Sequence, residues 1–168
     1  MCIEKEILIL KRKVKLMELK FSLDDLRLLE SHFKLNTDFE PKKNEPIEIP
    51  CDIGISHEKN NKAVNVIVSA NSHGEKQPFV FNVKIAGTFI FSKIPNKEQL
   101  GRVVHINCAA IIFPYVRETI ADLTRRASLP PFHIGPINFV ALYHKNRKSL
   151  PQKVEAKMFE NTPKEGTK

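Results

Sequence analysis

Apolar and polar residues alternate with a period of two through much of the first half of the chain. Successive side chains of a β-strand point to opposite faces of a sheet, so this alternation predicts half-buried strands. Four strands are expected at residues 29–39, 47–55, 64–70 and 79–91, separated by turns that contain Pro, Asn or Gly. Pro50 cannot donate a ladder hydrogen bond, which favours an edge position for the second strand.

The fourth predicted strand has the clearest pattern. Its residues of one parity are apolar or small throughout: Phe79, Phe81, Val83, Ile85, Gly87, Phe89 and Phe91. Gly87 has no side chain in the middle of this run, which indicates a bend, a bulge or the close approach of another element.

Beyond Pro95 the apolar positions follow a helical period. Leu100, Val103 and Val104 predict a short helix. Pro114 is expected at the first position of a longer helix, where its missing N–H does no harm. The apolar stripe of this longer helix consists of Val116, Ile120, Leu123 and Ala127.

Pro130 and Pro131 are expected to stop the long helix, and Asn138 is the expected N-cap of a last one. One face of that last helix carries Phe139, Leu142 and Tyr143. Four strands followed by helices predict an α+β fold, in which a four-stranded antiparallel sheet has C-terminal helices packed on one face.

The chain divides into three predicted segments. Residues 1–21 fit both helical and strand-like spacing and are assigned to an N-terminal extension, residues 22–148 to the folded domain, and the charged residues 149–168 to a basic, disordered tail. The apolar run 7–10 is too short and wrongly flanked for a secretory signal. No run of about 18 apolar residues is present. Three widely spaced Cys do not suggest a disulfide framework, so a cytoplasmic location is expected.

The formal net charge is +8, and Lys and Arg concentrate near both ends of the chain. A basic surface attracts nucleic acid, acidic lipid or an acidic protein partner. The terminal charges fit either solvated tails or a basic docking arm. No aromatic–basic nucleic-acid signature is found, and the connection at residues 128–137 is too long for a helix-turn-helix motif, so nucleic-acid binding is a minor hypothesis.

No enzyme motif is found in the sequence, and no cofactor is expected. There is no phosphate-binding Gly-rich loop, no GxSxG and no HExxH. His105 and Cys108 can share a helical turn, but two ligands do not make a zinc site, so no metal is predicted. Glu118 and Asp122 lie among arginines, which favours surface ion pairs over acid–base chemistry.

Two segments carry a family resemblance. Residues 113–126 read FPYVRETIADLTRR and residues 129–143 read LPPFHIGPINFVALY. Their aromatic-Pro-Tyr-x-Arg-Glu opening, Pro pair and Pro-x-Asn-Phe-x-Ala-Leu ending resemble the helix–proline–helix segment of the SecB family of protein-export chaperones. The resemblance covers about residues 24–144. Residues 23–36, LDDLRLLESHFKLN, are also similar to the SecB-like chaperones of toxin–antitoxin modules.

This resemblance implies a homotetramer built as a dimer of dimers, with sheets outside and long helices between. It implies a non-enzymatic holdase that keeps unfolded preproteins export-competent in hydrophobic grooves and passes them to the SecA motor. By position, the residues implied for the client-binding groove are Phe79, Phe81, Phe132, Phe139, Leu142 and Tyr143. Those implied for the oligomer interface are Tyr115, Val116, Ile120 and Leu123.

The sequence departs from the family in charge. SecB proteins are typically acidic and dock the basic tail of SecA through carboxylates, whereas this chain is basic. The family's Leu-Gly-Glu turn reads His73, Gly74 and Glu75 here, which leaves Glu75 as the candidate SecA-docking residue. The alternative hypothesis is therefore a SecB-like chaperone dedicated to an antitoxin or another single client.

Overall fold

The computed structural model describes residues 19–41, 47–74 and 76–149. Its order of elements is four strands followed by helices. The strands are β1 (Phe21–Leu35), β2 (Cys51–Asn60), β3 (Ala63–Ser72) and β4 (Phe79–Phe91). The helical segments are α2 (Lys97–Val103), η1 (Val104–Cys108), α3 (Ala109–Arg126) and α4 (Phe139–Ser149).

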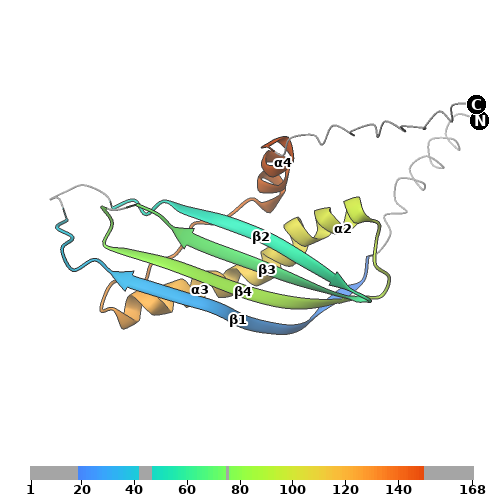
Figure 1. Cartoon of the computed structure of the whole chain (residues 1–168), viewed down its shortest axis with the longest axis horizontal. Coiled ribbons are helices and arrows are strands. Elements are labelled where there is room, and N and C mark those ends of the chain that lie inside the picture. The colour runs from blue at the N-terminus through green and yellow to red at the C-terminus, as the bar shows by residue number, and fades with distance from the viewer. Residues whose placement is uncertain (1–18, 42–46, 75, 150–168) are drawn as a thin grey trace, which may run out of the picture.

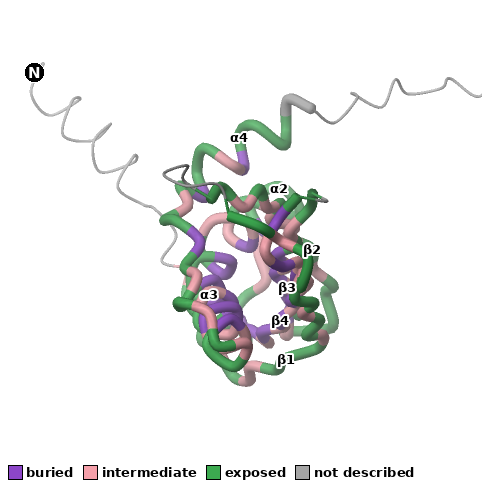
Figure 2. The backbone as a smooth tube through the Cα atoms, turned by 90° about the vertical axis from the view of Figure 1, so that its left-hand side faces the viewer, coloured by how far each residue is buried: buried purple, intermediate pink, exposed green. Residues whose placement is uncertain are grey.

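The strands form one antiparallel sheet in the order β1-β4-β3-β2. The long β4 lies in the interior of the sheet between β1 and β3, and β1 and β2 are its edges (Figure 1). The long helix α3 lies against one face of the sheet, and α4 lies past the β2 edge, as the end-on view shows (Figure 2). The predicted α+β class and the edge position of β2 are confirmed.

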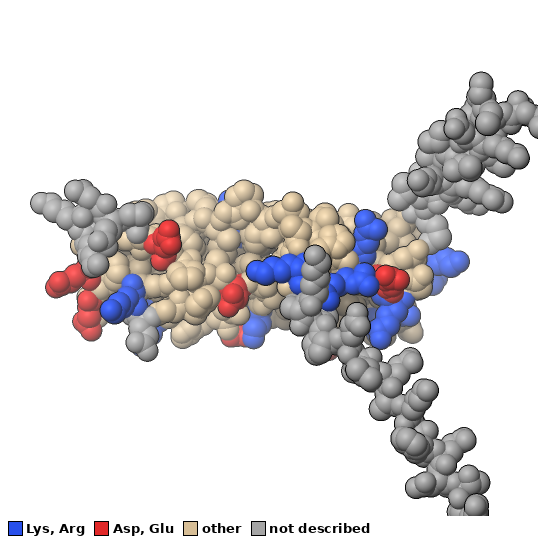
Figure 3. Space-filling view, turned by 90° about the horizontal axis from the view of Figure 1, so that it is seen from above, with Lys and Arg blue, Asp and Glu red and all other residues tan. Residues whose placement is uncertain are grey.

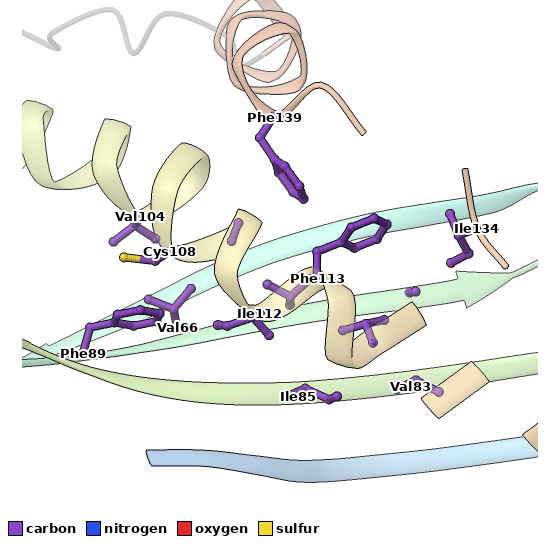
Figure 4. Packing of buried hydrophobic residues seen from close by; sticks show 14 of the residues in the cluster. Val66, Val83, Ile85, Phe89, Val104, Cys108, Ile112, Phe113, Ile134 and Phe139 are labelled. Carbon is purple, nitrogen blue, oxygen red and sulfur yellow. The ribbon is translucent and has the colours of Figure 1, made fainter. Parts of the chain in front are cut away.

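The core lies between α3 and the central strands. The inward side chains of β3 are Val64, Val66, Val68 and Ala70, and all four are fully buried. On β4 every second residue from Phe79 to Phe91 faces inward, as the alternation predicted. Ile112 of α3 packs onto them (Figure 4), and Val116 and Ile120 of the same helix belong to the same buried cluster. Each such fully buried aliphatic or aromatic side chain contributes about 1.5–3 kcal/mol to folding.

Gly87 lies where the helix and the sheet approach closely. A Cβ atom built on Gly87 would lie 2.9 Å from Cδ1 of Ile112. Of the three explanations that the sequence allowed, close approach by another element is the one that this geometry supports.

The first strand differs from its prediction at both ends. β1 begins at Phe21, well before residue 29, and ends at Leu35. Its pairing with β4 shifts register between Leu23 and Asp25 and again between Leu28 and Glu30. Each shift inserts one extra residue, so the alternation is interrupted and the strand is hidden in the sequence.

The second strand is also displaced. Residues 47–50 precede β2, and pairing with β3 begins with Cys51 opposite Ser72. Pro50 has no N–H for the ladder, which is a physical reason for the ladder to start after it. At the other end the strand continues to Asn60, and the turn shortens to residues 61 and 62, with φ of 48° at Asn61.

Pro114 does not begin a helix. It lies inside α3, which follows α2 and the π-helical η1 without interruption. Proline removes the hydrogen bond to the carbonyl one turn earlier, at Ala110. Both Pro114 and Ala110 are exposed, so water can solvate that carbonyl. The apolar stripe buried against the sheet keeps the helix intact despite this local signal.

Candidate client-binding surface

Four phenylalanines meet at one end of the inner sheet face. The ring of Phe79 lies 5.3 Å from that of Phe33 on β1 and 5.7 Å from that of Phe132, which follows α3. The ring of Phe81 lies 6.2 Å from that of Phe132. Phe79 and Phe81 are almost fully buried, whereas Phe33 and Phe132 are half-buried. The cluster therefore has a closed base and an accessible rim.

Thr124 holds the segment that carries Phe132. The backbone N–H of Phe132 donates to Oγ1 of Thr124 over 3.0 Å, and the hydroxyl donates to the carbonyl of Ala121 over 2.9 Å. The N–H of Leu129 donates to the carbonyl of Thr124 over 3.0 Å. Thr124 is fully buried, so these bonds fix the proline-rich segment against α3.

The last helix begins as predicted, at Asn138. The N–H of Ala141 donates to Oδ1 of Asn138 over 3.0 Å, which caps the helix. Phe139 is buried with its ring edge-on to Phe113 of α3, 5.5 Å away (Figure 4). Tyr143 is buried too, and Leu142 is half-buried. The predicted face of α4 is therefore its inward face.

Tyr143 docks α4 onto η1. Its ring lies 5.8 Å from that of His105. The guanidinium of Arg147 lies 5.7 Å from the Tyr143 ring and pairs with Glu98 of α2 over 3.3 Å. The cation over the ring adds to the aromatic contact. The position of α4 thus depends on contacts to both η1 and α2.

His105 and Cys108 both lie in η1, and burial shifts the pKa of each. Burial, and then the nearby His57 at 6.0 Å, lower the pKa of His105 below its ordinary value. Burial raises the pKa of the Cys108 thiol to about 12, so it stays protonated at neutral pH and is a poor ligand. Among the described residues, no group of three or more His, Cys, Asp or Glu is placed to hold a metal ion.

The rim of the inner face is apolar and half-buried along both edge strands. On β2 it consists of Cys51, Ile53 and Ile55, and on β1 of Phe21, Leu23, Leu26 and Phe33. The edge strand β1 pairs only with β4, and the edge strand β2 pairs only with β3. In the described part of the chain, the outer backbone N–H and C=O groups of β1 and β2 therefore pair with no other strand. An extended polypeptide can pair with such an edge while its side chains contact the rim.

The residues predicted for the oligomer interface separate into two groups. Val116 and Ile120 are fully buried in the protomer against its own sheet. Tyr115 is 48% exposed and Leu123 is half-buried. Glu75, the predicted SecA-docking residue, lies outside the described residues. The structure also adds Phe33 and Thr124, which the sequence did not single out.

In the described residues the sheet is open and antiparallel, with α3 on its apolar face and no strand paired to the outer edges of β1 and β2. The model of the family described as preprotein translocase subunit SecB matches residues 31–150. The chain therefore belongs to the SecB family. Within the described residues, no helix is long and apolar enough to cross a membrane.

Individual relatives agree with this assignment. The chain is 42% identical over 93 residues to a protein-export protein SecB of Burkholderia ambifaria, covering 55% of this chain and 56% of that one. It is 44% identical over 82 residues to the SecB of Burkholderia vietnamiensis, covering 49% of this chain and 51% of that one. The chain thus spans about half the length of the curated relatives it matches.

A solved structure supports the fold. The chain is similar to the Mycobacterium tuberculosis SecB-like chaperone solved in complex with a ChAD peptide from the HigA1 antitoxin, with a TM-score of 0.61. The two share 20% sequence identity, and the match covers 70% of this chain and 91% of the other.

Proposed function

We propose that this protein is a non-enzymatic holdase chaperone that binds unfolded preproteins and keeps them competent for export. The observation that carries the proposal is the half-buried apolar rim on β1 and β2, whose outer edges no described strand pairs with. Unfolded chains expose extended apolar segments, and such a surface binds them without catalytic geometry. Membership of the SecB family supports the same function.

The test is size exclusion coupled to light scattering, with the protein alone and mixed with a slow-folding denatured preprotein. The expected result is co-elution with the unfolded client and none with its folded form. Failure to bind any unfolded chain would contradict the proposal.

Variants of α4 and the segment before it make the test specific. Phe132→Ala and Leu142→Ala truncate half-buried side chains predicted to line the client-binding groove, and we expect each to weaken client binding by about tenfold, in the range of an interface contact of moderate strength. Val140→Ala is the matched control, because Val140 is 46% exposed on the same helix. Equal loss with the control would exclude the proposed rim as the binding surface.

A chaperone dedicated to an antitoxin or another single client is the second candidate. The observation that favours it is the basic charge, +8, which sets the chain apart from a generalist with an acidic surface. Binding to a panel of unrelated denatured proteins distinguishes the two. A generalist binds most of the panel, and a dedicated chaperone binds few or none.

We also propose a homotetramer in the cytoplasm. Cys51 and Cys108 are free thiols, which fits a reducing compartment. Docking to SecA through Glu75 stays a prediction. On the outer sheet face, Glu30 already pairs with Lys84 over 2.6 Å and Asp25 with Arg27, so these carboxylates are engaged within the protomer.

A further inference from the structure

Positive charge is unevenly distributed over the protein. On the outer sheet face and at the end of α3, cations are paired with carboxylates: Lys84 with Glu30, Arg125 with Glu118, and Arg126 with Asp122. The helices α2 and α4 differ. Their sequences, KEQLGRV and FVALYHKNRKS, contain one carboxylate, Glu98, among several Lys and Arg.

We name the α2–α4 basic surface by its exposed cations, Lys97, Arg102 and Arg147. Seen from the side of α4, Lys and Arg gather over these two helices, and acidic side chains lie mostly toward the other end of the molecule (Figure 3). Glu98 offsets Arg147 in this surface. Within the described residues of α2 and α4, the balance of charge is therefore positive.

This surface adjoins the candidate client-binding rim. Arg147 lies over the ring of Tyr143, Tyr143 contacts His105, and His105 faces His57 on the inner side of β2. Ile55 and Ile53 precede His57 on the same face of that strand and belong to the half-buried rim. A polypeptide lying along the inner side of β2 would therefore continue toward the basic surface.

We infer that the clients bound here carry acidic residues beside their apolar segment, and that the α2–α4 basic surface selects them by charge. The inference rests on the proposed holdase function and names its substrate class. Charges at the rim of an interface act mainly on association rate and on the choice of partner. They act over about a Debye length, which is near 10 Å at 0.1 M salt.

The test compares three labelled peptides with one apolar core, flanked by Glu, Gln or Lys, and measures their binding to the full chain by fluorescence anisotropy. At low salt we expect the Glu-flanked peptide to bind about tenfold more tightly than the Gln-flanked one, and the Lys-flanked peptide to bind most weakly. The differences should largely disappear near 1 M salt.

Reversing the charge of two α2 residues tests whether the preference for Glu-flanked peptides comes from the α2–α4 basic surface. The double variant Lys97→Glu with Arg102→Glu changes α2 and leaves the aromatic contacts of α4 in place. It should abolish the preference for Glu flanks and leave binding of the Gln-flanked peptide unchanged. The control is Lys34→Glu with Lys76→Glu, which makes the same change in net charge with two exposed lysines near the Phe79 end of the sheet. It should keep the preference.

The possible outcomes distinguish failure of the acidic-client inference from failure of the proposed holdase function. If no peptide binds at any salt concentration, the holdase proposal fails. If the Gln-flanked peptide binds and Glu flanks give no gain, or if the control variant loses the preference equally, the acidic-client inference alone is wrong. A single-stranded oligonucleotide that binds more tightly than the Glu-flanked peptide, and loses binding in the α2 variant, would assign the surface to nucleic acid and overturn the inference.

Discussion

Gly87 fixes the distance between helix and sheet. A Cβ at this position would lie 2.9 and 3.1 Å from two carbons of Ile112 and 3.1 Å from Cε2 of Phe89. Both neighbours are fully buried, so neither has free space to move into. We expect Gly87→Ala to destabilise the protein by about 1–3 kcal/mol, the typical cost of overpacking, as measured by urea unfolding.

A glycine in open surroundings provides the control. A Cβ added to Gly101, inside α2, would meet no atom within 4 Å, so Gly101→Ala should stabilise by about 0.5–1 kcal/mol through helix propensity. Adding Ile112→Val to Gly87→Ala should recover part of the loss. Unchanged stability in Gly87→Ala would show that α3 does not pack on β4 as closely as described.

The buried hydroxyl of Thr124 both accepts and donates a hydrogen bond. It accepts from the N–H of Phe132 and donates within α3. Thr124→Val keeps the shape but leaves that N–H without its acceptor, at a cost of about 1–3 kcal/mol. The expected results are a lower unfolding free energy and faster hydrogen exchange at the amide of Phe132. Thr124→Ser keeps the hydroxyl and should keep the exchange protection.

At the scale of elements, the docking of α4 should depend on pH. The pKa of His105 is lowered from 6.5, first by burial and then by His57. Since the folded state disfavours the charged form, the unfolded state binds the proton first as pH falls. The stabilising contribution is therefore complete above pH 6.5 and is lost as pH falls through the lower, folded pKa.

Hydrogen exchange along α4 measures this effect. Protection should be constant above about pH 6.5 and should fall as pH is lowered from there through the lower pKa of folded His105. The groups facing His105 are His57 from β2 and Tyr143 from α4, with Arg147 beyond the tyrosine ring. None of the three is a carboxylate. His105→Gln should remove most of the pH dependence, and an unaltered profile in that variant would assign the effect to another group.

Elements differ in how well the sequence predicted them. β4 matches its prediction from Phe79 to Phe91, because its alternation is unbroken over all 13 residues. β1 was predicted too late, because two register shifts break the alternation. The prediction of a helix start at Pro114 is wrong, because local sequence shows the missing N–H but not the sheet on which the helix packs.

The candidate site was predictable where it is local in sequence. Phe139, Leu142 and Tyr143 were expected on one helical face from their spacing, and in the structure that face is turned inward. Phe33 was missed because its contact with Phe79 comes from strand pairing between distant segments. A single sequence likewise shows an apolar stripe at Val116 without showing that the protomer's own sheet covers it.

At the scale of the whole molecule, the isolated protomer exposes much apolar surface. Leu28 and Leu29 on β1 are 55% and 53% exposed, and Leu35 is 40% exposed. On α3, Ile111 is 39% and Tyr115 48% exposed, one helical turn apart. Exposed apolar surface of this kind marks interaction sites in soluble proteins. Client binding and self-association both bury exposed apolar side chains, so the proposed tetramer must cover some of these residues.

Replacing the α3 pair tests how the protomers associate. Ile111→Glu with Tyr115→Glu places two charges one turn apart, where both side chains are exposed and the core is not disturbed. Burying them at an interface without partners would cost several kcal/mol, enough to reduce association by more than a hundredfold. We expect light scattering to show a smaller oligomer with unchanged far-ultraviolet circular dichroism.

The control Arg125→Glu with Arg126→Glu alters exposed residues of the same helix near its end. If the α3 pair leaves the mass unchanged, the contact between protomers lies on the edge strands instead, and the apolar residues of β1 become the surface that the assembly buries.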